Sequence, residues 1–442
     1  MEELIRPLTT EEISGGHLET VTDSGEMKNV VFILVGHYLP GFKGGGPTRS
    51  ISNLVSALGK EFTFKVITLD RDLGAALPYP GVPAGRWIRI GNADVMYLTP
   101  GFRGLLRMVE LLHSLDQSAV LYLNSFFSRR FSMLAIFLRR LGLIHPGSLV
   151  IAPRGEFSPG ALQLKRGRKM LHIRLSRWLD LYRGVIWHAS TQLEAANILE
   201  WFRGVGVIRI ASVIPKSPEC DEILTNPTLL TSHSLMQQPG TKSRTRPNKA
   251  TGHLRVVFLS RISPKKNLLG ALRMLQNVSG KVSFDIYGPL EDPEYWNSCK
   301  KVIGTLPPNI LALYAGEVEH DRVFDVFAEY DLFLFPTLGE NYGHVICESL
   351  GAGCPVLISD QTPWRDLQNA GVGWDIPVHD KERFSAILQQ CVDADEEWFA
   401  PLRAKAEEYA RKCVADPGVI DANRKLFQNA MDRNGEKFSL GR

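Results

Sequence analysis

Short apolar runs alternate with amphipathic stretches along this 442-residue chain, in two successive series. The runs are rich in Val, Ile and Phe, as β-strands are, and the stretches between them space their apolar residues as helices do. Repeated βα units of this kind build open sheets of parallel strands. The first series comprises 29–36, 62–69, 119–125, 148–153, 185–190 and 206–213. The second comprises 254–260, 282–288, 309–317, 331–337 and 355–360. We therefore predict two α/β domains in tandem.

A polar segment rich in Ser, Thr and Pro separates the two series and predicts an interdomain linker or a disordered insertion. The chain is longer than one core usually serves, which agrees with two domains. After about residue 381 only helical patterns remain, and these helices can pack on the second domain or cross back onto the first. The predicted divisions are a disordered N-terminal extension over 1–27, a first domain over 28–215, the linker over 216–253, a second domain over 254–400 and C-terminal helices over 401–442.

Several features indicate the cytoplasm. The first 20 residues are acidic and polar, so no signal peptide is expected. The longest apolar runs, VVFILVG and SMLAIFL, are far shorter than the ~20 residues that span a bilayer. The six cysteines are scattered without a C-x-x-C pair, which indicates reduced thiols rather than a disulfide framework or a zinc site.

A basic segment extends from Ser128 to Arg183, with 12 Lys and Arg residues against Glu156 and Asp180. Such a segment attracts anionic surfaces or phosphate-bearing ligands. Its mixture of cationic and apolar helix faces suits peripheral contact with anionic lipid, but arginines around an ordinary surface helix give the same pattern. Nucleic acid is not expected as a partner, because no binding motif accompanies the charge.

Two acidic residues lie eight positions apart in the segment GENYGHVICESLGAGCPV, which follows an apolar strand. If Glu340 precedes a helix that starts near Tyr342, both Glu340 and Glu348 can meet a ligand at the helix N-terminus. The free amides there attract a diphosphate, and carboxylates suit sugar hydroxyls. Alternatively, Glu340 is a helix cap and Glu348 is a buried partner of a helix end.

Two cations follow the first strand of the second domain. Arg261 comes directly after the strand and Lys266 five residues later, at a helix start. Such a pair can neutralise a leaving diphosphate without a metal ion, although solvated surface charges would also fit. Lys265 is expected to be the solvated neighbour.

A glycine-rich loop follows the first strand of the first domain, in HYLPGFKGGGPTRS. Glycines before a helix allow backbone amides to approach an anion closely. The loop matches neither G-x-G-x-x-G nor the phosphate-binding Lys-Ser/Thr loop, so by itself it is weak evidence and a flexible loop is the default interpretation.

Together and in this order, the glycine loop, the Arg-x4-Lys pair and the Glu-x7-Glu segment resemble retaining glycosyltransferases of family 4. The resemblance covers about residues 29–380 and implies the GT-B fold, two Rossmann-like domains that face each other across a cleft. The segment APRGEFSPGALQLKRGRKM is similar to a branch that acts in exopolysaccharide and lipopolysaccharide biosynthesis. The first domain would then face the acceptor, and the second would bind the nucleotide sugar.

The resemblance also implies roles for single residues. Arg261 and Lys266 match the residues that hold the donor diphosphate, and Glu340 matches the acid that faces the donor sugar. Glu348 matches the residue that binds the ribose hydroxyls. The donor-binding set implied in this way is Gly45, Gly46, Arg261, Lys266, Asn341, Tyr342, Gly343 and Glu348, with Glu340, Arg261 and Lys266 as the catalytic residues.

Three basic residues are expected on the acceptor side. Arg154 stands where many relatives place a histidine, and it can bind an acceptor or a phosphate but is a poor general base. Lys165 and Lys169 are four residues apart, so they share a helix face and can meet an acceptor diphosphate. Asn267 replaces the glycine that usually follows Lys266.

No metal and no cofactor are expected besides the nucleotide-sugar substrate. Asp70-Arg71-Asp72 spells D-x-D, a metal-binding motif of the other major glycosyltransferase fold, but it follows an early strand in a chain that resembles metal-independent enzymes.

The sequence thus predicts a retaining, metal-independent hexosyltransferase that acts on a lipid-linked or polysaccharide acceptor in cell-surface polysaccharide biosynthesis, at the cytoplasmic face of the membrane. A sugar-nucleotide epimerase, or a sucrose- or trehalose-type synthase, is an alternative on the same scaffold. A non-catalytic nucleotide-binding assembly protein is a third alternative, which the retention of all four charged residues disfavours.

Overall fold

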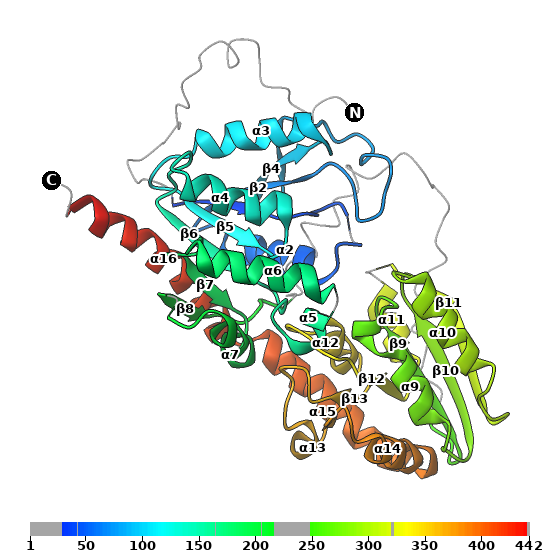
Figure 1. The fold of residues 1–442 in the computed structure, drawn as a ribbon. Helices are drawn as coiled ribbons and strands as arrows, with labels where there is room; N and C mark the ends of the chain where they lie inside the picture. Colours follow the sequence, from blue (N-terminus) through cyan, green and yellow to red (C-terminus); the bar gives the residue numbers. More distant parts are fainter. Residues whose placement is uncertain are drawn as a thin grey trace, which may run out of the picture.

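A computed structural model describes residues 29–41, 43–163, 165–204, 206–215, 248–319 and 322–439. Within these ranges the chain forms two α/β domains, each built on its own sheet (Figure 1). The predicted fold class is therefore confirmed. Residues 1–28 and 216–247 lie outside the described residues, as do the predicted N-terminal extension and most of the predicted linker.

The first sheet has the strand order β3-β4-β2-β1-β5-β6-β7-β8. All neighbours are parallel except β3 and β4, which are antiparallel. The strands are β1 (Val30–Leu34), β2 (Thr63–Leu69), β3 (Trp87–Ile90), β4 (Ala93–Leu98), β5 (Val120–Asn124), β6 (Ser148–Ala152), β7 (Ile186–Ala189) and β8 (Val207–Ile210). Every residue of β5 and β6 is buried, because helices cover both faces of the sheet.

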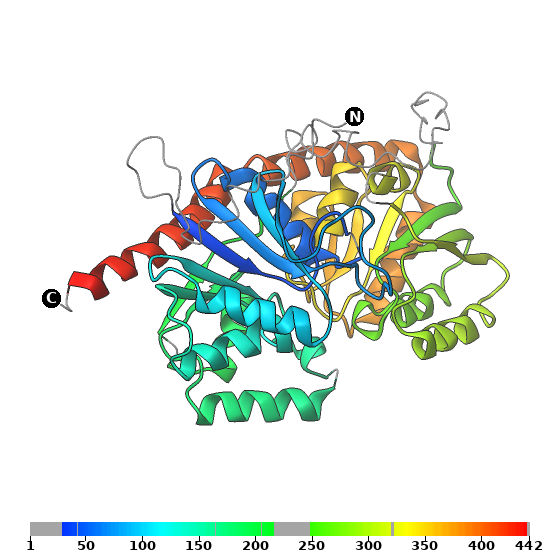
Figure 2. The same ribbon diagram turned by 90° about the horizontal axis from the view of Figure 1, so that it is seen from above.

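Helices on opposite faces of this sheet enclose two separate cores. α3, α4 and α6 lie together on one face, whereas α2 lies on the other (Figures 1 and 2). The helices of the domain are α2 (Gly46–Leu58), α3 (Phe102–His113), α4 (Leu134–Arg140), α5 (Pro159–Gln163), α6 (Arg166–Trp178) and α7 (Gln192–Trp201), with a π-helical turn η1 (Arg129–Met133) before α4.

The second sheet is entirely parallel, with the order β11-β10-β9-β12-β13-β14. Its strands are β9 (His253–Leu259), β10 (Lys281–Tyr287), β11 (Ile310–Gly316), β12 (Leu332–Phe335), β13 (Val356–Ser359) and β14 (Gly373–Ile376). Its helical segments are η4 (Pro264–Lys266), α9 (Leu268–Leu275), α10 (Pro293–Ile303), α11 (Val323–Ala328), α12 (His344–Gly351), α13 (Leu367–Ala370) and α14 (Lys381–Asp393). β9 and β12 are neighbours, so their carboxyl ends meet at one edge.

The last two helices join the domains. α15 (Glu396–Val414) packs on α12 of the second domain, and α16 (Pro417–Ser439) crosses back onto the first (Figure 2). Phe427 on α16 is fully buried, and its ring contacts those of Phe62, Phe64 and Tyr122. The C-terminal end of the chain thereby completes a core whose strands lie near the start of the described sequence.

Replacing Phe427 with Ala should lower the free energy of unfolding by about 3–5 kcal/mol, because it leaves a cavity between α16 and the first sheet. Gln428→Ala, at the next and exposed position, should change it by less than about 0.5 kcal/mol. Urea denaturation followed by circular dichroism measures both. Equal stability of the two variants would contradict the packing of α16 on the first domain.

Candidate active site

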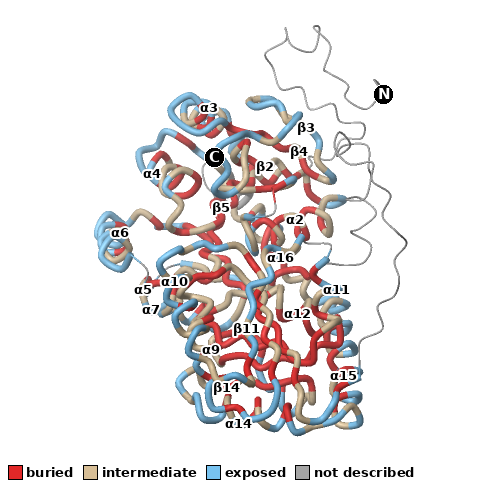
Figure 3. Tube along the Cα trace, turned by 90° about the vertical axis from the view of Figure 1, so that its right-hand side faces the viewer, coloured by how far each residue is buried: buried red, intermediate tan, exposed pale blue. Residues whose placement is uncertain are grey.

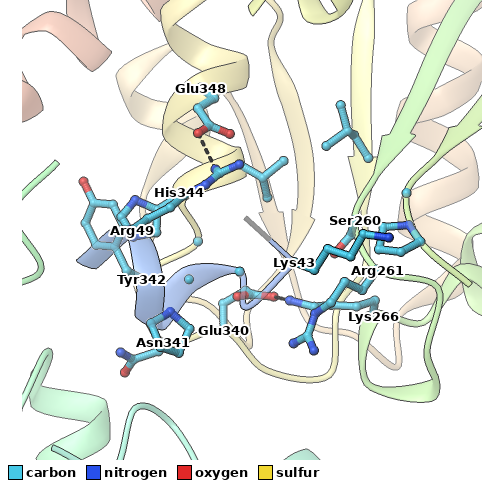
Figure 4. Close-up of a pocket in the computed structure, with 18 of the residues that line it drawn as sticks. Lys43, Arg49, Ser260, Arg261, Lys266, Glu340, Asn341, Tyr342, His344 and Glu348 are labelled. Atoms are coloured by element: carbon cyan, nitrogen blue, oxygen red, sulfur yellow. Dashed lines mark hydrogen bonds and ion pairs between the residues drawn. The ribbon is translucent and has the colours of Figure 1, made fainter. Parts of the chain in front are cut away.

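A cavity of about 400 Å³ lies between the carboxyl ends of the two sheets (Figure 4). Its first-domain wall consists of residues that follow β1, β5 and β6. Its second-domain wall consists of residues that follow β9, β10, β11 and β12. Ligands of open parallel sheets bind at this edge, where loops and helix starts present their side chains and amides.

An ion pair between Lys266 and Glu340 lies on the second-domain wall. Lys266 ends η4 after β9, and Glu340 follows β12, so the pairing of these two strands brings the side chains together. The Lys266 ammonium donates to Glu340 Oε1, and both side chains are only 12% exposed. The ammonium also lies 5.5 Å from the centre of the Phe335 ring.

The electrostatic surroundings of Glu340 keep it ionised. Burial by itself would raise the pKa of this carboxyl group, but the charge of Lys266, followed by those of Lys265 and Arg261, outweighs burial and lowers the pKa below its ordinary value of 4.5. The carboxylate is therefore negative at neutral pH.

Lys265 and Arg261 extend the positive charge along the same wall. Lys265 lines the cavity and is half-buried, and burial lowers the pKa of its ammonium. The prediction that Lys265 is a solvated neighbour is therefore wrong, because the turn from β9 into η4 directs it into the cleft. Arg261 also lines the cavity, and its guanidinium donates to Glu291 Oε1 at 2.8 Å.

Asn267 has a structural reason to stand after Lys266. Its backbone is left-handed, with φ of 59°, a conformation that Gly and Asn adopt most readily. Its side chain accepts from the Gly270 amide at 3.2 Å and donates to the Pro336 carbonyl at 2.8 Å. Asn267 therefore caps α9 and ties the turn of Lys266 to the segment that leads to Glu340.

Glu348 faces the first domain from α12. Its Oε1 accepts from Arg49 Nη1 at 2.5 Å, and one turn earlier His344 Nε2 lies 3.2 Å from Ser50 Oγ (Figure 4). The N-terminus of α12 is capped by Gly343, whose φ is 80°. The alternative in which Glu340 caps the helix is therefore wrong.

Residues 341–343 connect the two carboxylates, and Asn341 touches the first domain. Asn341 Nδ2 donates to Ser190 Oγ of the first domain at 3.0 Å. The Tyr342 ring packs edge-on against His344 and Trp364. All three residues line the cavity, as predicted for donor-binding positions, whose roles stay predictions.

The glycine loop lies opposite the cations of the second domain. Gly45 has φ of 68°, and a Cβ atom added there would be 4.0 Å from Arg261 Nε. A Cβ atom on Gly46 would lie 4.0 Å from the His344 ring. Both glycines line the cavity at the start of α2, so the loop, the cations and the two glutamates converge on one space.

Arg154 enters the cavity from the end of β6 and is held on three sides. Its Nε donates to Asn124 Oδ1 at 3.1 Å, and its Nη2 donates to Tyr122 Oη at 2.8 Å. A third contact joins Nη1 to Ser190 Oγ at 3.5 Å. Burial, and then the charge of Arg154, lowers the pKa of His188 to about 3, so His188 is neutral behind the guanidinium.

Comparison with known families identifies the second half of the chain. Residues 241–413 match the family model described as glycosyl transferases group 1. This part of the chain is a group 1 glycosyltransferase domain. No curated protein sequence matches the chain.

Solved structures share the architecture of the whole chain. A structure of Anabaena HepE in complex with UDP and glucose is 14% identical, with a TM-score of 0.60, over 91% of this chain and 99% of that one. Sucrose-phosphate synthase from Thermosynechococcus elongatus is 13% identical, with a TM-score of 0.64, over 91% and 99%. The α,α-trehalose-phosphate synthase of Burkholderia vietnamiensis is 11% identical, with a TM-score of 0.59, over 92% and 100%. The predicted GT-B fold is thereby confirmed.

Two predicted acceptor-side residues lie away from the cavity that the group 1 domain forms with the first domain. Lys169 Nζ donates to the Ala161 carbonyl at 2.6 Å and lies 5.1 Å from the centre of the Phe127 ring. Lys165 is an exposed residue with a left-handed backbone immediately before α6. Neither lines the cavity, and their contact with an acceptor stays a prediction.

Several cavity residues were missed in the sequence. Arg49 and His344 lie in the first turns of the helices that follow the two loops, and Glu156 follows Arg154 by two residues. Arg49 had a signal, since a cation one turn after a glycine loop faces the same space as the loop. Glu156 is fixed by Ser125 Oγ at 2.6 Å, and burial raises the pKa of its carboxyl group.

Glu340→Gln should make the free energy of unfolding depend less on pH in the acid range. Because neighbouring cations lower the pKa of Glu340 in the folded protein, its carboxylate contributes stability above the ordinary value of 4.5, and this contribution is lost as the pH falls through the folded pKa. At pH 7 the variant should be less stable by about 1–3 kcal/mol, since Lys266 loses its partner.

Urea denaturation of the wild type and Glu340→Gln across the acid range checks this expectation. The difference between them should shrink below the ordinary pKa of 4.5. Glu317→Gln, at a carboxylate that is 45% exposed on the same cavity, is the matched control and should show little effect at any pH. A constant difference for Glu340→Gln would contradict the electrostatic account.

Proposed function

We propose that the protein is a retaining hexosyltransferase that uses a nucleotide-diphosphate sugar and acts on a lipid-linked or polysaccharide acceptor in cell-surface polysaccharide assembly. The group 1 domain and the GT-B fold support glycosyltransferase activity. The observation that carries the proposal is the convergence of the Lys266–Glu340 pair, Arg261, Glu348 and the glycine loop on one cavity. Cations for a diphosphate and carboxylates for sugar hydroxyls then face the same ligand.

In the proposed reaction the departure of the nucleoside diphosphate creates the charge that the site must stabilise. Lys266 and Arg261 neutralise the leaving diphosphate together with the free amides at the start of α12. Lys265 adds a third positive charge at the same wall. The acceptor hydroxyl attacks from the face that the diphosphate leaves. With these cations in place, the proposed mechanism needs no metal ion or cofactor.

The two glutamates have separate tasks in this proposal. Glu340 orients the donor sugar through its hydroxyls and does not form a covalent intermediate, because Lys266 holds its carboxylate in an ion pair. Glu348 accepts hydrogen bonds from the ribose hydroxyls. The structure of HepE contains UDP and glucose, so UDP-hexoses are the first donors to test on this chain.

The acceptor is proposed to approach over the first domain. Arg154 offers a fixed guanidinium at the cavity wall, and the basic segment around it favours an acceptor that carries phosphate. We place the enzyme in the cytoplasm, at the inner face of the plasma membrane, where a lipid-linked acceptor would be reached.

A sucrose- or trehalose-type synthase remains the second candidate, because two structures with the same fold belong to sucrose-phosphate and trehalose-phosphate synthases. Incubation with radiolabelled nucleotide sugars separates the candidates. Label on extracted lipid supports the proposed transferase, whereas label on a soluble disaccharide phosphate supports a synthase. An epimerase would label neither, and a non-catalytic protein would bind donors in calorimetry without turnover.

Lys266→Ala should reduce transfer by at least about 100-fold in kcat, because it removes a charge that acts on the leaving diphosphate. Lys300→Ala, at an exposed position on α10, is the control and should keep wild-type turnover. Release of the nucleoside diphosphate from the preferred donor measures both. Near-normal turnover of Lys266→Ala would refute the proposed mechanism.

Glu348→Gln should weaken donor binding about 10–100-fold, because the ribose hydroxyls lose a charged acceptor. Thermal shifts with UDP-, GDP- and ADP-sugars measure it, since a bound donor stabilises the folded protein by mass action. Arg49→Gln is the matched control, because it breaks the same interdomain contact and leaves the carboxylate. Equal weakening in both variants would show that Glu348 acts through that contact and not on the ribose.

A further inference from the structure

α6 carries apolar side chains on its outer side. Its inward side buries Ile173 and Ser176 against the first-domain core. On the opposite side Leu171 is 59% exposed, Leu175 44% and Trp178 80%. At 3.6 residues per turn these three positions form one stripe along the helix. A stripe of this size on a surface helix is open to a partner.

The stripe continues onto neighbouring elements. Arg139 Nη1 on α4 donates to the Arg183 carbonyl at 3.0 Å, which places the end of α4 beside the segment that follows α6. Near this junction Leu179, which follows α6, and three residues on or just after α4 are exposed and apolar: Phe137, Leu141 and Leu143. α4 and α6 lie in one layer, and α6 projects from it (Figures 1 and 3).

Positive charge surrounds these apolar side chains. Arg168 and Arg174 are exposed and flank Leu171 on the helix surface, about 60° away on either side. Residues 134–184 contain ten Lys and Arg residues, and the acidic residues of this segment are Glu156 and Asp180. Glu156 is turned inward, where it accepts from the Phe127 amide at 3.0 Å. Asp180 alone therefore opposes the surface charge with an exposed carboxylate in this segment.

We propose that this α4–α6 surface, made of Phe137, Leu141, Leu143, Leu171, Leu175, Trp178 and Leu179 with Arg168 and Arg174, docks on an anionic lipid bilayer. Leucine and tryptophan enter the boundary between headgroups and acyl chains, and arginines contact the lipid phosphates. The contact is peripheral, since no helix within the described ranges is long and apolar enough to cross a membrane.

The geometry also connects this surface with the cavity. α5, which precedes α6, abuts the second domain, because a Cβ atom on Gly160 would lie 2.5 Å from the Leu338 carbonyl oxygen. Leu338 is two residues before Glu340. α6 therefore runs from the rim of the cleft to Trp178 over about 20 Å. The inference rests on the proposed function only for the role of the membrane contact, which is to hold the cleft next to a lipid-linked acceptor.

Sedimentation of the intact protein with phosphatidylcholine vesicles, with and without phosphatidylglycerol, tests the surface. We expect binding to the anionic vesicles, weakened by salt. Trp178→Ala should weaken it about tenfold, since an exposed indole that enters the interface is lost. Arg168→Gln with Arg174→Gln should weaken it about 25-fold, at about fivefold for each charge.

Two controls lie on the second domain. Leu311→Ala, on the exposed side of β11, and Arg411→Gln, on the exposed side of α15, should bind vesicles like the wild type. Equal sedimentation with both vesicle types, or equal binding by all variants, would overturn the proposal. So would a dimer in light scattering that Trp178→Ala dissociates without a change in vesicle binding, because the stripe would then be an interface between copies of this chain.

The thermal shift with UDP-hexose separates this inference from the proposed function. Trp178→Ala should keep the donor-induced shift of the wild type, since Trp178 does not line the cavity. A wild-type protein that binds vesicles but shows neither donor binding nor turnover would refute the proposed function and leave the membrane surface standing. A protein that turns over donor but ignores anionic vesicles would do the reverse.

Discussion

The contact between Lys266 and Glu340 depends on the pairing of β9 with β12, two strands that are neighbours in the second sheet but distant in the chain. Parallel pairing places the carboxyl ends of both strands at one edge of the sheet. Short loops after the strands are therefore enough to bring the two side chains together. Over the whole cavity six Lys and Arg residues face four Glu residues, and this excess of positive charge fits an anionic ligand.

The last two helices, together with contacts across the cleft, hold the first domain in place relative to the second. α15 packs on α12, which carries Glu348, and α16 continues from it into the core beneath β1 and β5. The same rigid path therefore supports both the acid and the sheet that presents the glycine loop. Contacts across the cleft, such as that from Asn341 to Ser190, complete this arrangement.

The sequence predicts the local features well and the interdomain ones poorly. Alternating runs give most strands, because a buried parallel strand is a continuous run of apolar residues. β3 and β14 were missed, since β3 is half-exposed at the sheet edge and β14 is four residues long with a glycine and an aspartate. β4 was missed too, although its residues are almost all buried.

Within the site, the motifs and the family resemblance together predicted that Arg261, Lys266, Glu340 and Glu348 face one ligand, and all four line one cavity. The contact of Arg49 with Glu348 joins residues 299 positions apart and depends on how two domains meet, which no local pattern encodes. Lys265 was misjudged for a similar reason, since its direction is set by the short turn of η4 and not by its neighbours in the chain.

Within the protein, the Arg49 guanidinium already donates a hydrogen bond to the Glu348 carboxylate. The oxygen that accepts from the guanidinium is on the carboxylate proposed to accept from a ribose, so the two are rivals for one group. If the proposed ribose hydroxyl takes this oxygen, Arg49 must leave it, and the apparent affinity of the nucleotide is then the intrinsic affinity multiplied by the fraction of molecules in which the oxygen is uncovered. Because Arg49 belongs to the first domain and Glu348 to the second, this contact also joins the two domains. In the proposed function, nucleotide recognition is in this way coupled to a contact between the two domains.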